Sequence, residues 1–338
     1  MAANLDMTAD RANIAFLGSR ADVWHRQGQE MLPDQTIEDW AAAAGLGWRA
    51  LKVPAHASLI GPEFEHLADR MPRIDDRSFV VRSDTGATLG YVSGESAESG
   101  YQIVQPAAVL DWFQRYIAVD DRFALDVCGS LDGGRRIWAT AIYNGIIPVA
   151  GEEHRARVLM STTFDGSGST INQCTMTRVV CSNTMRVSHA DSRAQIKTRH
   201  NTAFNADQVG RELARLAEGF AVYKTIGDAL ARVHMTADQV AAFFDKVMAI
   251  PPTVPGVKVS TRKSNQVIQL YQALGLSVAE GAAPNTAWAA LQAVTRYADH
   301  DASVKHGGGD VGTARFNSSQ FGNGDALKGR ALELLQAA

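Results

Sequence analysis

Asp-Gly turns between alternating segments constrain the fold of this chain most. Residues 122–144, RFALDVCGSLDGGRRIWATAIYN, alternate apolar and polar positions and reverse at an Asp-Gly-Gly turn. Residues 157–180 repeat the pattern around Asp-Gly-Ser-Gly, and residues 78–93 repeat it around Asp-Thr-Gly. Alternation with a period of two predicts half-buried strands, and glycine at the reversal predicts hairpins. The middle of the chain is therefore expected to be antiparallel β-structure.

Helical spacing of apolar residues dominates the second half of the chain. It predicts helices over 204–249 (two helices), 261–275, 285–299 and 325–336. Two earlier helices are predicted, one capped by Thr36 with Asp39 and one over 106–118 with Pro106 in its first turn. The Gly/Ser/Asn-rich stretch 305–324 predicts a long loop. We therefore expect an α+β protein: antiparallel β-hairpins packed with a basic helix, followed by a mainly helical C-terminal half.

This pattern divides the chain into three parts. Residues 1–75 are expected to form an N-terminal segment that is partly flexible. Residues 76–203 are expected to form a β-rich core that ends in a basic helix, and residues 204–338 a helical C-terminal region.

The composition is that of a soluble globular protein, with 46% hydrophobic and 20% charged residues. No apolar run approaches the roughly 18 residues that a membrane span requires, and the first residues do not resemble a signal peptide. The three cysteines, Cys128, Cys174 and Cys181, form no CxxC pair. We expect a cytoplasmic protein whose cysteines, Cys181 included, are buried packing residues rather than nucleophiles.

Charge is distributed unevenly along the sequence. Residues 1–170 hold 15 Lys and Arg against 23 Asp and Glu, whereas residues 171–338 hold 18 against 13. Such an asymmetry favours an anionic partner for the basic half.

The segment TRVVCSNTMRVSHADSRAQIKTRH, 177–200, carries most of this basic character. If 182–200 is helical, Arg186, His189, Arg193, Lys197 and His200 fall within roughly 80° of one another around the axis. Asp191 is the one acidic residue in this segment. Such a strip suits the successive phosphates of a stretched single strand, although a solvated helix face is the alternative reading.

Two further basic clusters contain aromatic residues. The first holds Lys258, Arg262 and Lys263 near Tyr271, and the second runs from Lys305 to Phe321. Cations with interspersed rings suit single-stranded nucleic acid, because phosphates pair with cations and bases stack on rings. The residues expected to bind nucleic acid are Arg178, Arg186, His189, Arg193, Lys197, Arg199, His200, Lys258, Arg262 and Lys263.

Common enzyme signatures are missing from the sequence. It contains no GxxxxGK[ST], GxSxG or HExxH motif, and no GxGxxG between a strand and a helix. Asp299 and His300 form the densest candidate cluster, but no clear second group of metal ligands accompanies them. We expect no metal, no cofactor and no identifiable catalytic residue. A metal-dependent DNA-processing enzyme that uses Asp299 and His300 remains an alternative, as does a host-interaction or anti-host protein.

Three segments resemble the phage/plasmid-like proteins of unknown function, a family spread among phages, plasmids and laterally transferred regions. They are RVVCSNTMRVS, APNTAWAALQAVTRYADH and FNSSQFGNGDALKGRALELL. The matching positions are Cys181, Asn183, Thr184, Asn285, Thr286, Trp288, Ala293, Tyr297, His300, Phe321, Gly322, Gly324, Lys328 and Ala331. Met185 stands where the family has leucine. The resemblance implies a mobile-element setting and supplies no catalytic residues.

Hairpins followed by a basic helix also resemble the core of single-strand annealing recombinases, an analogy of fold and context. The expected function is therefore that of a phage or plasmid protein that binds single-stranded DNA and anneals or protects it in recombination, without ATP. We expect it to act as a homo-oligomer, either a ring or a filament, because an assembly lines up many copies of one basic strip.

Overall fold

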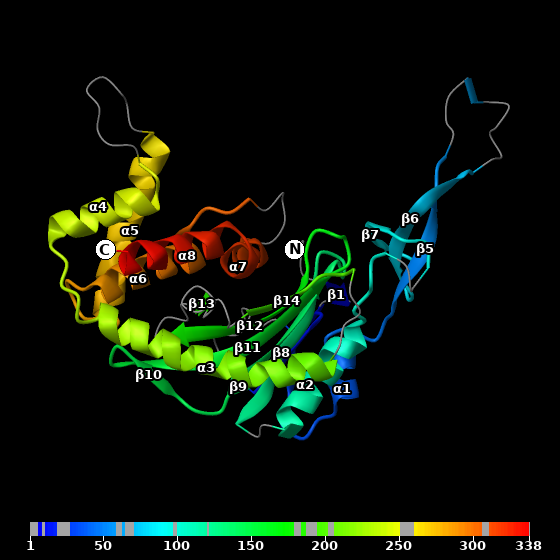
Figure 1. Ribbon diagram of the computed structural model, residues 1–338, viewed down its shortest axis with the longest axis horizontal. Coiled ribbons are helices and arrows are strands. Elements are labelled where there is room, and N and C mark those ends of the chain that lie inside the picture. Colours follow the sequence, from blue (N-terminus) through cyan, green and yellow to red (C-terminus); the bar gives the residue numbers. More distant parts are fainter. Residues whose placement is uncertain are drawn as a thin grey trace.

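The computed structural model describes residues 6–8, 11–18, 28–58, 63–64, 71–96, 100–119, 122–178, 184–186, 195–201, 206–250, 260–305 and 311–337. Strands fill most of the first half and helices most of the second (Figure 1). The expected α+β fold class is confirmed.

The strands are β1 (Met7–Thr8), β2 (Arg11–Ala12), β3 (Ile14–Leu17), β4 (Gln29–Met31), β5 (Ala50–His56), β6 (Arg73–Arg82), β7 (Thr88–Ser93), β8 (Phe123–Leu131), β9 (Arg136–Tyr143), β10 (Ile147–Val149), β11 (Glu152–Thr163), β12 (Thr170–Arg178), β13 (Thr184–Arg186) and β14 (Gln195–Thr198). The helices are α1 (Ile37–Ala43), α2 (Pro106–Val119), α3 (Ala206–Leu230), α4 (Ala237–Val247), α5 (Thr261–Ala279), α6 (Ala287–Arg296), the π-helix η5 (Tyr297–Asp301), α7 (Val311–Phe321) and α8 (Asn323–Gln336).

The main sheet runs in the order β13-β12-β11-β9-β8-β3-β4, with β10 beside β11 and β14 beside β12. Its neighbours pair antiparallel except β3 and β4, which are parallel. The predicted hairpins are confirmed: β6–β7, β8–β9 and β11–β12 each pair across the expected turn. Asp132 and the two glycines after it have positive φ, the backbone conformation that such a turn needs.

Helices cover both faces of the main sheet, so that its strands are buried on two sides (Figure 1). On one face, α2 packs against β8 and β9, and α3 packs against β10 and β12. On the other face, Val127, Trp138 and Leu159 form a cluster with Phe316 and Phe321 of α7. Trp138 and Phe316 have ring centroids 5.5 Å apart. The C-terminal helices are thereby fixed to the sheet.

A separate three-stranded sheet, β5-β6-β7, projects at the end of the molecule away from α4 and α5 (Figure 1). Residues 75 and 76 lie inside β6, and β3 and β4 from the N-terminal segment join the main sheet. The expected boundary between the N-terminal segment (1–75) and the β-rich core (76–203) therefore falls within a strand.

The prediction of a basic helix over 182–200 is wrong for the residues that the structure describes there. Thr184–Arg186 and Gln195–Thr198 are strands, and both pair with β12 along the same edge. An edge strand presents a row of backbone donors and acceptors, and pairing satisfies them. Because strand residues alternate between faces, the continuous helical strip of cations does not exist in this form.

The prediction of a loop over 305–324 is also wrong for most of its length. Val311–Phe321 is helix α7, and α8 begins at Asn323. The Gly/Ser/Asn composition of α7 favours a turn, but the burial of Phe316 and Phe321 against the sheet outweighs that propensity.

Local signals predicted most of the other elements correctly. Thr36 and Thr236 each form a capping box, with Asp39 and Gln239 respectively. Cys128 and Cys174 are fully buried, and burial raises the pKa of both thiols, as expected of packing residues. Cys181 lies outside the described residues. Within the described part of the chain, no helix combines the length and apolar character that spanning a membrane needs.

Candidate functional site

A polar cavity of about 410 Å³ lies beside the turn that joins β11 to β12. Its wall is formed by Ser93 at the end of β7, residues 100–101, residues 166–169 and residues 199–201. Three regions distant in sequence (93–101, 166–169 and 199–201) thus meet there, and they contribute hydroxyl, amide, imidazole and guanidinium groups. The arrangement offers many hydrogen-bond donors and one cationic side chain to a ligand.

The Gly-Ser turn forms one side of this cavity. The Asp165 carboxylate accepts hydrogen bonds from the N–H (2.9 Å) and the hydroxyl (2.6 Å) of Ser167, which fixes the turn. Gly166 has a φ of +77°, which disfavours other residues. In the described structure the amides of Gly166, Gly168 and Ser169 donate to no other group. Free amides in a turn form an anion-binding concavity.

A stacked pair, Tyr101 and His200, forms the base of the cavity, with ring centroids 4.3 Å apart. The Tyr101 hydroxyl donates to the Thr163 carbonyl oxygen at 2.5 Å. His200 Nδ1 lies 2.8 Å from the Gln102 carbonyl oxygen, so that this nitrogen carries a proton and donates it. Burial lowers the pKa of His200, and the hydrogen bond to Gln102 acts in the opposite direction. The imidazole is therefore neutral at neutral pH and acts as a packing group.

This burial predicts a pH-dependent stability. In the unfolded chain His200 titrates near its ordinary pKa of about 6.5, whereas folding lowers that pKa. As pH falls through the unfolded value, the unfolded chain takes up a proton that the folded chain does not, and stability is lost. We expect wild type to lose more unfolding free energy than His200→Gln between about pH 7.5 and about pH 5.5, measured by urea denaturation. Equal losses in the two proteins would contradict this role of burial.

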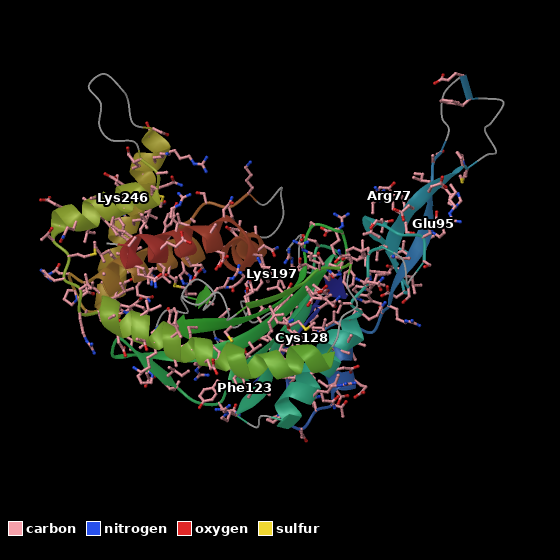
Figure 2. The ribbon with its side chains drawn as sticks, viewed as in Figure 1. Arg77, Glu95, Phe123, Cys128, Lys197 and Lys246 are labelled. Carbon is pink, nitrogen blue, oxygen red and sulfur yellow. The ribbon has the colours of Figure 1, made fainter. Side chains whose placement is uncertain are left out.

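Two exposed cations lie on the segment that leads into the cavity wall, and one of them, Arg199, lines the cavity. Lys197 is exposed on β14, and Arg199 follows the strand directly, two residues further on. Within the described part of the chain neither side chain forms an ion pair or a hydrogen bond. Figure 2 shows Lys197 over the main sheet. Their charges are therefore available to an anionic partner.

The structure places the other predicted binding residues differently. Arg186 is largely buried and pairs with Asp325 at 2.5 Å, so it stabilises the fold instead of facing solvent. His200 is buried within the cavity wall. Arg262 is exposed on α5, and Lys263 of the same helix donates to the Ala249 carbonyl oxygen. Helix α5 and strand β7, which carries Ser93, lie at opposite ends of the molecule (Figure 1). His189, Arg193 and Lys258 lie outside the described residues, as does the side chain of Arg178.

A second polar cluster joins segments that carried the family resemblance. Lys328 Nζ donates to Asp299 Oδ1 (2.9 Å), to Ser319 Oγ (3.1 Å) and to the Thr184 carbonyl oxygen (2.6 Å). Asp299 also accepts from the Thr184 N–H at 2.7 Å and from the Ser319 hydroxyl. The Lys328 and Asp299 side chains are 1% and 7% exposed. This cluster holds β13 against the C-terminal helices by hydrogen bonds, and both carboxylate oxygens of Asp299 accept hydrogen bonds within it.

No group of three or more His, Cys, Asp and Glu side chains in the described ranges is placed to hold a metal ion. For Asp299 to act as a metal ligand with His300, it would have to give up the pair with Lys328.

Sequence reasoning identified Lys197 and Arg199 but missed the residues that surround them. In the sequence the Gly-Ser turn indicates only a hairpin connection, and no local pattern marks Ser93 or Tyr101. One signal was available, since Asp-Gly-Ser-Gly-Ser is longer than a two-residue hairpin turn needs.

Comparisons with known proteins match this chain to one family. A family model described as "Domain of unknown function (DUF932)" matches residues 95–319. The matched span holds α2, the larger part of the main sheet, the Gly-Ser turn and residues 199–201. No curated protein and no solved structure matches the chain.

Proposed function

We propose that this chain, which belongs to the family of the domain of unknown function DUF932, binds single-stranded DNA. The proposal is based on the polar cavity and on the exposed cations beside it. Lys197 and Arg199, on one extended segment beside the free amides of the Gly-Ser turn, carry the proposal. Lys197 lies in β14 and Arg199 directly after it, and residues two apart in an extended chain lie about 6.6 Å from each other. That spacing lets neighbouring phosphates of an extended strand each meet a cation.

The proposed role is annealing or protection of single strands in recombination of a phage or plasmid, in the cytoplasm and without ATP. The resemblance of three segments to phage/plasmid-like proteins supports the setting, and the missing nucleotide-binding motif supports the independence from ATP. Two exposed cations per chain give weak binding, so the proposal includes a homo-oligomer, ring or filament, that aligns many copies along one strand.

Binding is tested by fluorescence anisotropy of a labelled single-stranded oligonucleotide over a range of salt concentrations. We expect Lys197→Ala/Arg199→Ala to weaken binding about 25-fold at 0.1 M salt, because each phosphate contact contributes a factor of about five there. The slope of log K against log salt should become shallower by about 1.4.

Lys246→Ala/Arg232→Ala is the matched control, since both side chains are exposed and the net charge changes equally. Unchanged binding in the first double variant, or an equal effect in the control, would contradict the assignment of Lys197 and Arg199. An absence of binding even at low salt would overturn the proposed function. Strand cleavage that requires Mg²⁺ and is lost in a folded Asp299→Asn/His300→Ala double variant would instead favour a nuclease.

A further inference from the structure

The three-stranded sheet β5-β6-β7 exposes apolar side chains on one of its faces. Leu51, Val53 and Tyr91 are 40%, 43% and 46% exposed. The pairing register places Leu51 opposite Val81, Val53 opposite Phe79, and Phe79 opposite Tyr91, so these side chains share a face.

The opposite face of the same sheet is part of the core. Ala50, Val80, Leu89 and Val92 are each at most 5% exposed. The fold therefore already uses one face of this sheet for its own stability. The exposed face, by contrast, leaves several large apolar side chains in water, which a soluble protein rarely does over a contiguous area without a binding role.

Two aromatic rings lie side by side on that exposed face. The Phe79 and Tyr91 ring centroids are 5.3 Å apart, and the ring planes are inclined by 47°. Phe79 is half-buried between its neighbours, whereas Tyr91 lies on the edge strand β7. Rings fixed in this way on a rigid sheet can stack flat aromatic groups with little loss of side-chain entropy.

The aromatic face continues into the polar cavity. Ser93 lines the cavity and follows Tyr91 by two residues on the same strand, so both lie on one face about 6.6 Å apart. Arg77 pairs in register with Ser93 and is 44% exposed (Figure 2). Its nearest acid, Asp76, is 3.9 Å away and itself exposed, so this surface ion pair is weak. Arg77 thus adds a third cation where the cavity meets the aromatic face.

We propose that the face formed by Leu51, Val53, Phe79 and Tyr91 stacks the bases of the single-stranded nucleic acid whose phosphates lie at Arg77, Lys197 and Arg199. This inference rests on the proposed function. It adds recognition of the bases, which the cations do not contact. Bases in a duplex are already stacked on one another, so this face selects single strands. Continuity with the cationic cavity favours a nucleic acid over an apolar protein segment as the occupant.

The test compares two labelled probes of equal length, an oligothymidylate and an abasic deoxyribose-phosphate strand, by fluorescence anisotropy with the full chain. Wild type should bind the thymidylate at least about fivefold more tightly than the abasic strand, because one base stacked on a ring contributes at least that factor. Tyr91→Leu should lose this preference, and Tyr91→Phe, which keeps the ring, should retain it.

Tyr271→Leu provides the matched control, since Tyr271 is an equally exposed tyrosine, 43%, on α5. Equal affinity of wild type for the two probes, or equal effects of Tyr91→Leu and Tyr271→Leu, would overturn the stacking face. In that outcome Lys197→Ala/Arg199→Ala still weakens both probes and the proposed function stands. If neither probe binds at low salt, the proposed function and the stacking face both fail.

Discussion

Replacing Lys328 with methionine is expected to lower the free energy of unfolding by about 3–5 kcal/mol. The Lys328 side chain is 1% exposed, and its ammonium group donates to Asp299, Ser319 and the Thr184 carbonyl oxygen. The substitution keeps most of the side-chain volume but leaves the Asp299 carboxylate buried without its cation. An uncompensated buried charge is far more costly than the loss of a surface pair.

Urea denaturation at neutral pH measures this effect. Lys246→Met is the control, because Lys246 is exposed on α4 and its replacement should change stability by at most about 0.5 kcal/mol. Removing both charges, in Lys328→Met/Asp299→Asn, should recover part of the loss. A loss below about 1 kcal/mol in Lys328→Met would show that the pair does not hold β13 against the helices.

Gly90→Ala is expected to destabilise the protein by about 1–3 kcal/mol and to weaken DNA binding as well. A Cβ at position 90 would lie 2.3 Å from the Asp165 Cα and 2.4 Å from the Phe164 carbonyl oxygen. Both are backbone atoms that cannot rotate away. Either β7, which carries Tyr91 and Ser93, or the Gly-Ser turn must therefore move, and both line the proposed binding surface.

Thermal unfolding and anisotropy with the oligothymidylate measure the two effects of Gly90→Ala. Gly47→Ala is the matched control, since a Cβ at position 47 meets nothing within 4 Å and the backbone there does not have a positive φ. If Gly90→Ala has the same stability and the same affinity as wild type, the contact between β7 and the Gly-Ser turn can shift without loss of stability or binding.

The position of Lys328 illustrates how much of this protein a sequence can predict. The resemblance placed Thr184, Tyr297 and Lys328 in three separate segments. The structure brings Thr184 and Lys328 into direct contact at a buried cluster that also contains Asp299. No local pattern distinguishes a buried lysine from a solvated one on an amphipathic helix, because the difference depends on which segment packs over it.

The candidate site was predicted in part. Few acidic residues accompany Lys197 and Arg199 in the sequence, which indicates a charged surface, and both side chains are exposed. Arg186 came from the same reasoning but is buried against Asp325, more than a hundred residues away. Its partner could not be known from the segment alone.

By itself the sequence determined the features that depend on neighbouring residues: the hairpin turns, the capping box at Thr36, and the change from strands to helices. These follow from backbone conformation and hydrogen bonds within a few residues. Tertiary structure alone decided that residues 184–186 and 195–198 form edge strands instead of parts of a helix and that α7 is helical. It also decided that Ser93 of β7, the Gly-Ser turn and residues 199–201 line one open cavity. Those outcomes depend on burial and pairing between distant segments, which outweigh local propensity.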